Sequence, residues 1–471
     1  MSKDYYTTIG LEVHAELNTT SKMFCSCRND PDAGTPNSNI CPVCMAHPGA
    51  LPVPNKKAIE SVIRVGLAIG ADIADFTEFD RKNYFYPDIP KGYQISQYKY
   101  PIVSGGELHG VKITRVHLEE DTATSQHTGD VSLVNYNRAG VPLMELVTEP
   151  VIRTPEQAGN FARELQLLLR YLNVSEANME KGQMRVELNI SVSDKPDVFG
   201  TKVEVKNINS FRAVERAAVY ETKRMIDLLE SGRGNEIVQE TRGWDENKQA
   251  TFSQRSKENA QDYRYFPDPD IPKYYLRTLF DIPALQAGLP ELPAMKRIRY
   301  QEQFGIKADD VENYVSDPDL GMYFEDVVTE LAGNKEAIQT ASNYIISDLV
   351  GLKKKDTNFE FPYAHHLAEL VLMIGAGELS SRAAKDLLPI LRSENRSPRA
   401  IADERGLIQK DDPEALQKLA EKVISENSEA VASYKSGKQN ALMSLVGVIM
   451  KESKGSANPA KAKEMLEKIL S

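Results

Sequence analysis

Two short acidic segments contain the residues best suited to carry out chemistry. Between residues 9 and 17, Glu12, His14 and Glu16 alternate with apolar residues, so a β-strand here would place all three on one face. A carboxylate and an imidazole at this spacing can both reach one divalent ion. The alternative interpretation is an ordinary solvated face, which antiparallel strands often have.

The second acidic segment is Glu119-Glu120-Asp121. Three adjacent carboxylates repel one another, and a bound cation relieves that repulsion. Glu149 is a further candidate ligand. Together these residues predict a Mg²⁺ site in which carboxylates and substrate phosphates share the ion. Because Mg²⁺ rarely takes a nitrogen ligand, we expect His14 either to act through a water molecule or to favour Mn²⁺.

The cysteines form two close pairs, Cys25-x-Cys27 and Cys41-x-x-Cys44, separated by 13 residues. Two such pairs joined by a loop can bring four thiolates around one tetrahedral ion, which is how proteins hold structural zinc. The alternative is four reduced thiols without a metal. Because the chain has no other cysteine, we expect zinc.

The length and charge of the chain limit what kind of protein it can be. At about 100–200 residues per domain, 471 residues indicate roughly two to four domains. The net charge of -11 argues against a protein that coats nucleic acid non-specifically, because such binding needs a large cationic surface. No stretch of about 18 apolar residues is present, and the first residues do not form a signal peptide. We therefore expect a cytoplasmic protein without a transmembrane helix.

Several common catalytic motifs are absent from the sequence. It contains no P-loop, no kinase-type glycine-rich loop with a following Asp-Phe-Gly, and no Gly-x-Ser-x-Gly turn. A zinc site would use every cysteine, which leaves none as the nucleophile of a glutaminase. From these residues alone, we expect an enzyme that uses a metal ion and acts on an unknown substrate.

The secondary structure predicted for the first part of the chain is mixed. Apolar and polar residues alternate in three segments, which we expect to be strands of a largely antiparallel sheet with one polar face: 9–17, 184–190 and 201–205. Helical periodicity and capping residues predict three helices: 56–69, 154–172 and 212–229. The first would begin after Asn55, and the second with a capping box at Thr154.

The second part of the chain is predicted to be helical. Strand-like alternation ends near residue 291, and sequence breaks at 266–272 and 393–399 separate the parts. We therefore predict an α+β fold with a sheet domain at 1–293, an all-α domain at 294–394 and a helical tail at 395–471. The tail has 13 Lys and Arg against 11 Asp and Glu, so the acidic excess lies outside it.

The sequence closely resembles the B subunits of the tRNA-dependent amidotransferases, the GatB family. Long motifs in the same order carry the resemblance: IGLEVHAELNTTSKMFC (9–25), FDRKNYFYPDIPKGYQISQY (79–98), HLEEDT (117–122), NRAGVPLMELVTEPV (137–151), EVKNINSFR (204–212), DYRYFPDPDI (262–271), RGLIQK (405–410) and YKSGKQNALMSLVGVIMKESKGSANPA (434–460). They extend over essentially the whole chain.

This resemblance implies a cradle-like sheet domain, a helical domain and a helical tail that contacts tRNA. It implies that ATP and Mg²⁺ are used to phosphorylate the side-chain carboxyl of Glu-tRNA(Gln), Asp-tRNA(Asn) or both. Ammonia from a partner amidase, the A subunit, then displaces the phosphate, and a small C subunit completes a heterotrimer. Zinc would be structural, because only some relatives have the cysteines.

The resemblance also implies roles for individual residues. It places metal ligands at Glu12, His14, Glu119, Glu120 and Glu149, and among these Glu12, His14 and Glu120 are the expected catalytic residues. Substrate or nucleotide is expected to contact two matching motifs and one further arginine: Arg185, Glu187 and Asn189; Lys206, Asn207, Asn209 and Ser210; and Arg264.

Two positions depart from the family pattern. Many relatives have Asp-Ala-Gly-Lys after the paired glutamates, whereas this chain has Thr124 in place of the lysine, so a phosphate contact from that lysine is missing. Glu187 stands where aspartate is common. The alternative to an enzyme is a zinc-stabilised tRNA scaffold whose chemistry lies in a partner. An archaeal-type E subunit is excluded, because those chains carry an inserted domain that this length does not accommodate.

Overall fold

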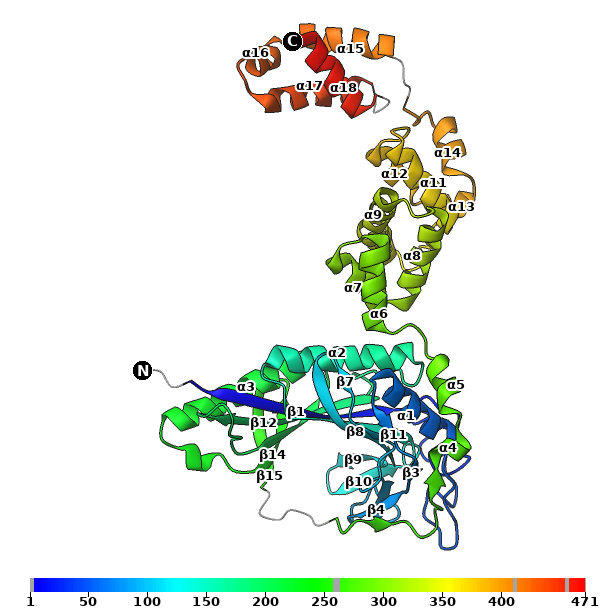
Figure 1. The fold of residues 1–471 in the computed structure, drawn as a ribbon, viewed down its shortest axis with the longest axis vertical. Coiled ribbons are helices and arrows are strands. Elements are labelled where there is room, and N and C mark those ends of the chain that lie inside the picture. Colours follow the sequence, from blue (N-terminus) through cyan, green and yellow to red (C-terminus); the bar gives the residue numbers. More distant parts are fainter. Residues whose placement is uncertain (1–3, 257–262, 410–412, 454–456, 471) are drawn as a thin grey trace. The chain divides into compact units, whose positions relative to one another are not determined.

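The computed structural model describes residues 4–256, 263–409, 413–453 and 457–470. The chain divides into two compact units, residues 1–293 and 294–471 (Figure 1). This division falls where the sequence predicts the end of the first domain. Among the described residues, no helix is long and apolar enough to cross a membrane.

A ten-stranded sheet forms the centre of the first unit. Its strands are β1 Tyr6–Glu16, β2 Asp72–Ile73, β6 Val103–Ser104, β7 Glu107–Leu108, β8 Val111–Glu120, β11 Pro142–Thr148, β12 Met184–Ser193, β13 Val203–Ile208, β14 Glu240–Asp245 and β15 Ala250–Ser256. The strand order is β15-β14-β13-β12-β1-β11-β8-β6-β2, and β7 pairs with β8. Neighbours are antiparallel except β13 and β14, which are parallel. The predicted α+β class and antiparallel sheet are therefore confirmed.

Three long helices pack on one face of this sheet (Figure 1). They are α1 Lys56–Ala68, α2 Pro155–Tyr171 and α3 Phe211–Glu230. Each begins at a residue whose side chain accepts hydrogen bonds from first-turn N–H groups, namely Asn55, Thr154 and Ser210. All three helices and the capping box at Thr154 agree with the sequence prediction.

The apolar core lies between these helices and the sheet. Ile9, Leu11, Val13 and Ala15 of β1 are at most 1% exposed and face the apolar stripes of the helices. Because side chains of a strand alternate between faces, the residues between them must point to the opposite side. The packing of the core thus fixes which side chains of β1 are available for chemistry.

The opposite face of the sheet carries polar side chains and is flanked by smaller elements. Three of these are strands of one small sheet: β4 Asp80–Asn83, β5 Tyr93–Ser96 and β16 Phe266–Pro267. The others are the pair β3 Phe76–Thr77 and β17 Tyr274–Tyr275, the hairpin β9 Thr124–Thr128 and β10 Val131–Asn135, and the short helices η1 Gly234–Glu236, α4 Leu276–Leu279 and α5 Ile282–Ala287. β5 contacts β8, which brings the small sheet to the polar face.

The second unit is helical in all its described elements. Its first helices are α6 Pro293–Arg299, α7 Ala308–Ser316, α8 Pro318–Glu330, α9 Lys335–Asn343, α10 Val350–Lys355, α11 Ala364–Gly375, α12 Ser381–Leu387, α13 Leu391–Glu394 and α14 Pro398–Glu404, with π-helical turns η3 Tyr300–Phe304 and η4 Tyr344–Leu349. Tyr300, Tyr314 and Phe324 are fully buried at its centre. The predicted change from strands to helices is confirmed.

The last four helices share a separate apolar core that includes Leu445, Ile449 and Leu466. They are α15 Pro413–Glu426, α16 Ser428–Lys435, α17 Gln439–Glu452 and α18 Pro459–Leu470. α14 instead packs against α11 and α12. The segment from 395 to 409, which the sequence analysis assigns to the tail, thus lies with the preceding helices.

Candidate active site

The polar face of the sheet presents its charged side chains in rows, because four neighbouring strands pair in antiparallel register. Across β8, β11, β1 and β12, one row consists of His117, Glu145, His14 and Arg185. The neighbouring row consists of Arg115, Val147, Glu12 and Glu187. Residues two apart on a strand point to the same side, so both rows project from one face.

A cavity of about 390 Å³ lies over these rows. Its floor is formed by the charged residues of the sheet. Part of its wall consists of four tyrosines from the segments around β4, β5 and β16, Tyr84, Tyr98, Tyr263 and Tyr265. The rings of Tyr98 and Tyr265 stack with their centroids 4.4 Å apart. The cavity therefore combines an ionic floor with an aromatic wall.

The first cluster of possible metal ligands in this cavity is His14, Glu119 and Glu145. His14 Nε2 lies 3.6 Å from a Glu119 oxygen and 3.4 Å from a Glu145 oxygen. Burial disfavours a charged imidazole, but the hydrogen bond and charge of Glu145 and the charge of Glu119 raise the pKa of His14 to about 9. His14 is therefore an imidazolium at neutral pH in the metal-free protein, and metal binding at Nε2 must release its proton.

Glu145 is the shared carboxylate of this cluster. Besides His14, its oxygen lies 3.2 Å from His117 Nε2. Burial favours the protonated acid, yet the two imidazoles hold the pKa of Glu145 well below its usual range. The carboxylate is thus ionised and held in position between two rings, which is the state that a metal ligand requires.

The second cluster is Glu12, Glu187 and Glu204, whose oxygens lie within 4.8 Å of one another. Asn189 donates a hydrogen bond of 2.8 Å to Glu12, and Lys206 Nζ lies 2.9 Å from Glu187 and 3.3 Å from Glu204. Burial, and then the neighbouring carboxylates, raise the pKa of Glu12. A divalent cation would relieve the repulsion that a single lysine leaves uncompensated.

The three adjacent acids at the end of β8 point in different directions. Only Glu119 lies in the first cluster. Glu120 points to the opposite face, where it is 2.8 Å from Lys91 Nζ and accepts a hydrogen bond of 2.9 Å from the N–H of Ile95. Asp121 pairs with two arginines, Arg138 at 2.6 Å and Arg185 at 2.9 Å. The carboxylates therefore do not need a shared cation.

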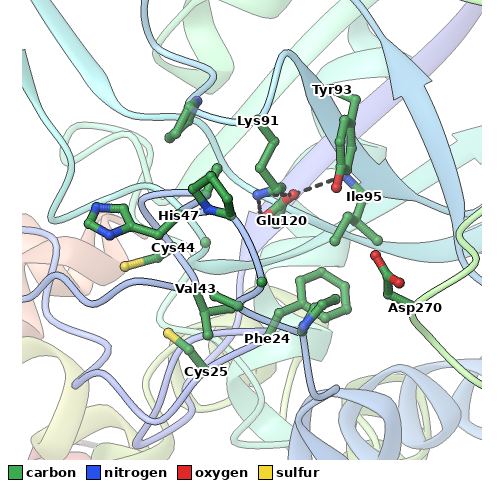
Figure 2. A pocket seen from close by; sticks show the side chains of 17 residues that line it. Phe24, Cys25, Val43, Cys44, His47, Lys91, Tyr93, Ile95, Glu120 and Asp270 are labelled. Carbon is green, nitrogen blue, oxygen red and sulfur yellow. Dashed lines mark hydrogen bonds and ion pairs between the residues drawn. The ribbon is translucent and has the colours of Figure 1, made fainter.

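Glu120 contributes instead to a second cavity, of about 280 Å³, beside the cysteine loop (Figure 2). Figure 2 shows the ion pair of Lys91 and Glu120 on one side of this cavity and Cys25 and Cys44 on the other. The structure thus separates Glu120 from Glu12 and His14, with which the sequence analysis groups it.

The four cysteines come together as the spacing predicts. Their sulfurs lie within 4.8 Å of one another, and those of Cys41 and Cys44 are 3.9 Å apart. Sulfurs around tetrahedral zinc, with bonds of about 2.3 Å, are about 3.8 Å apart. The hydrogen bond from Cys25 outweighs burial and lowers the pKa of Cys44 to about 5, which favours the thiolate that zinc needs. These residues fit a structural zinc ion.

The other predicted contact residues differ in their positions. Arg185, Glu187 and Lys206 line the first cavity. Asn207 and Asn209 are exposed outside its lining, and Ser210 caps α3. The side chain of Arg264 is exposed, between two tyrosines of the aromatic wall. Glu149 accepts a hydrogen bond of 2.7 Å from Thr114 and is not among the residues lining the cavity.

Glu145 and Lys82 are the main residues of the cavity that the sequence analysis did not select. Glu145 is one acid within an apolar strand, where alternation would have placed it on the same face as Leu143 and Val147. Lys82 on β4 also lines the cavity. It reaches the cavity only through the tertiary contact of the small sheet with β8, for which the sequence holds no signal.

Both clusters have ligands that suit a divalent cation of the Mg²⁺ or Mn²⁺ class. Carboxylates dominate them, one imidazole is present, and neither contains a thiol. The floor of the cavity could neutralise a polyphosphate through such cations, and Lys82 and Arg115 add positive charge. The arrangement is suited to phosphoryl transfer, which depends on positioning and charge neutralisation rather than on a covalent nucleophile.

Comparison with known proteins identifies likenesses over most of the chain. A family model described as the GatB/GatE catalytic domain matches residues 7–280, and one described as the GatB domain matches 322–470. A protein of Picosynechococcus sp. is 42% identical over 98% of this chain and 97% of its own length. One of Persephonella marina is 42% identical over 99% of this chain and 100% of its own. Both relatives are named as the B subunit of an aspartyl/glutamyl-tRNA(Asn/Gln) amidotransferase.

The raised pKa of His14 predicts how the stability of the metal-free protein depends on pH. The ion pairs of His14 contribute fully below its unfolded pKa, near 6.5, and are lost as the pH rises through about 9. In EDTA, we expect the free energy of unfolding of the wild type, relative to His14→Gln, to fall by at most about 3 kcal/mol over this range. Urea unfolding at each pH measures the difference, and parallel profiles would contradict the assignment.

The cysteine cluster predicts one zinc ion per chain. We expect Cys27→Ser and Cys44→Ser to lose that zinc and to unfold at lower temperature, because the loop then lacks its cross-link. His47→Ala is the matched control, since His47 lines the neighbouring cavity but is not part of the cluster. Elemental analysis of the purified proteins measures the metal. A wild type that neither contains nor binds zinc stoichiometrically would contradict the prediction.

Proposed function

Since the chain belongs to the GatB family of amidotransferase B subunits, we propose that it activates the side-chain carboxyl of Glu-tRNA(Gln), Asp-tRNA(Asn) or both with ATP and converts it to an amide. The observation that carries this proposal is the cavity with two clusters of ionised or ionisable ligands on one face of the sheet. The enzyme is then an ATP-dependent carbon–nitrogen ligase that takes its nitrogen from glutamine.

The reaction has two steps. First, a carboxylate oxygen of the aminoacyl group attacks the γ-phosphorus of ATP, and the bond from that phosphorus to the ADP oxygen breaks. This gives an acyl phosphate, which has the good leaving group that a carboxylate lacks. Second, ammonia attacks the acyl carbon, the bond to phosphate breaks, and loss of one proton leaves the amide and inorganic phosphate.

The residues of the polar face have distinct parts in this proposal. Bound Mg²⁺ or Mn²⁺ would neutralise charge on the phosphates, and His14, Glu119 and Glu145 would hold one such ion. Glu12 and Glu187, with Glu204, would hold a second. His117 keeps Glu145 in position, and Asn189 does the same for Glu12. The two clusters are preorganised by contacts within the sheet, so little reorganisation is needed during transfer.

The proposal gives Glu120 a role outside phosphoryl transfer. With Lys91 it lies in the cavity beside the cysteine loop, within the same domain. The relatives are named as one subunit of an amidotransferase, which implies partner subunits. We propose that an amidase subunit supplies ammonia and that a small third subunit completes a heterotrimer. The cysteine loop, stabilised by zinc, then has a structural role.

The tail helices are the proposed contact for tRNA. Lys435, Lys438 and Lys451 on or beside α16 and α17 are exposed. Of the tail motif used for the family resemblance, residues 454–456 lie outside the described residues, as do Lys410 and Asp262 of two other motifs. The surface lysines support contacts with phosphates, which add affinity and position the tRNA without reading its sequence.

Substitutions in the two acid clusters test the enzymatic role. In the purified complex, we expect His14→Ala and Glu145→Gln to lower ATP-dependent transamidation about 100-fold, because each removes charge-neutralising contacts from the transition state. Glutamine hydrolysis by the partner should be unchanged. Glu149→Gln is the matched control and should keep the wild-type rate. Full transamidation by both cluster variants would support a tRNA scaffold instead.

Neutralising the tail lysines tests the tRNA contact. We expect Lys435→Ala, Lys438→Ala and Lys451→Ala together to weaken tRNA binding and to make its dependence on log salt concentration less steep by roughly two to three. ATP binding at the cavity should be unchanged. Filter binding at several salt concentrations measures both quantities. An unchanged affinity and salt slope would refute a role of these lysines.

A further inference from the structure

The cations of the active-site cavity fall into two groups. Arg185 and Lys206 are each paired with a carboxylate of the polar face, Asp121 at 2.9 Å and Glu187 at 2.9 Å. Their charges are therefore compensated within the protein. Arg115, which also lines the cavity, differs from both.

Arg115 is a cation without a partner among the described residues. Its Nε is buried and has no hydrogen-bond partner, and its guanidinium forms no ion pair with the described acids. A buried guanidinium N–H that donates no hydrogen bond is costly, by about 1–3 kcal/mol. The cost persists in a cavity that contains many carboxylates, so the side chain is held away from them by the sheet.

The register of the sheet explains this separation. Arg115 on β8 is opposite Val147 on β11, and Val147 is opposite Glu12 on β1. With strands about 4.8 Å apart, the backbones at Arg115 and Glu12 are about 10 Å apart across the small side chain of Val147. Arg115 and the cluster of Glu12, Glu187 and Glu204 thus flank one shallow gap in the floor.

A group that fills this gap must offer negative charge to Arg115 and oxygen ligands to a cation at the acid cluster. A phosphate does both, since its oxygens can bridge a divalent ion and accept two hydrogen bonds from a guanidinium. Lys82 on β4 lines the same cavity, and no ion pair of its ammonium with a described carboxylate is present. The ammonium lies 5.2 Å from the ring of Tyr263.

We propose that Arg115, assisted by Lys82, binds the phosphoryl group that is transferred from ATP. This inference rests on the proposed function and adds a catalytic residue to it. As the bond from the γ-phosphorus to ADP breaks and the bond to the substrate carboxylate forms, the guanidinium stays on the non-bridging oxygens of the moving group. Arg115 also supplies a fixed cation in a chain that has Thr124 where many relatives have lysine.

The test compares nucleotides that have or lack the γ-phosphate. We expect Arg115→Gln, in the purified complex with Mg²⁺, to weaken binding of a non-hydrolysable ATP analogue at least about 10-fold and to change ADP binding less than about 2-fold, since a charged bidentate contact is worth roughly this much. ATP-dependent transamidation should fall about 100-fold. Arg115→Lys keeps the charge but not the fork and should fall between the two.

Two further variants separate a phosphate contact from a structural role. Val147→Phe fills the gap without changing any charge and should weaken the analogue selectively, as Arg115→Gln does. Arg64→Gln is the control, since Arg64 lies on α1, against the apolar face of the sheet. It should leave binding and rate unchanged. Isothermal titration calorimetry and single-turnover rates provide the readouts.

The outcomes are distinguishable from those of the proposed function. If the wild type binds neither nucleotide, the proposed function fails, and the role of Arg115 fails with it. If the wild type binds both and Arg115→Gln behaves identically, only the role of Arg115 is overturned. Equal weakening of ADP and of the ATP analogue would also overturn it, because the contact would then not be with the transferred group.

Discussion

The antiparallel register of β8, β11, β1 and β12 is the constraint on which the rest of the structure depends. It places Ile9, Leu11 and Val13 against the helices and turns Glu12 and His14 to the other side. A slip of one residue would exchange the two faces, which would bury charges among the helices and expose the core. The apolar core and the ionic cavity are therefore two consequences of one pairing, and the large buried surface of the core holds the ionic residues in place.

The cost of gathering so many acids on one face is met unevenly across it. The carboxylates of Asp121 and Glu145 are each paired with two cationic partners, which keep their pKa below its usual range. Glu12 has a raised pKa, because burial and its acidic neighbours are not offset by enough positive charge. This residual repulsion is what a divalent cation would remove, whereas Arg115 keeps a positive charge in reserve for an anion. The cavity is thus suited to bind a metal–phosphate unit rather than either ion alone.

Much of the fold could be predicted from the sequence, because alternation and capping are local signals. The strand at 9–17, the helix caps and the approach of the four cysteines all follow from spacing, and the structure confirms each. The site was less accessible. Glu120 was grouped with His14 by adjacency in sequence, although alternation on β8 sends it to the opposite face. Glu149 lies just beyond a register shift between Val147 and Thr148, which no local pattern reveals. Lys82 enters the cavity through tertiary packing alone.

The central claim is that the polar face of the sheet holds the metal ions of phosphoryl transfer. Anomalous diffraction from crystals of the complex, grown with Mn²⁺ and a non-hydrolysable ATP analogue, tests it most directly. We expect a manganese peak within bonding distance of His14, Glu119 and Glu145, with the analogue's phosphates extending from it toward Arg115. Manganese bound instead at Glu120 or Glu149, or nucleotide bound outside this cavity, would contradict the account.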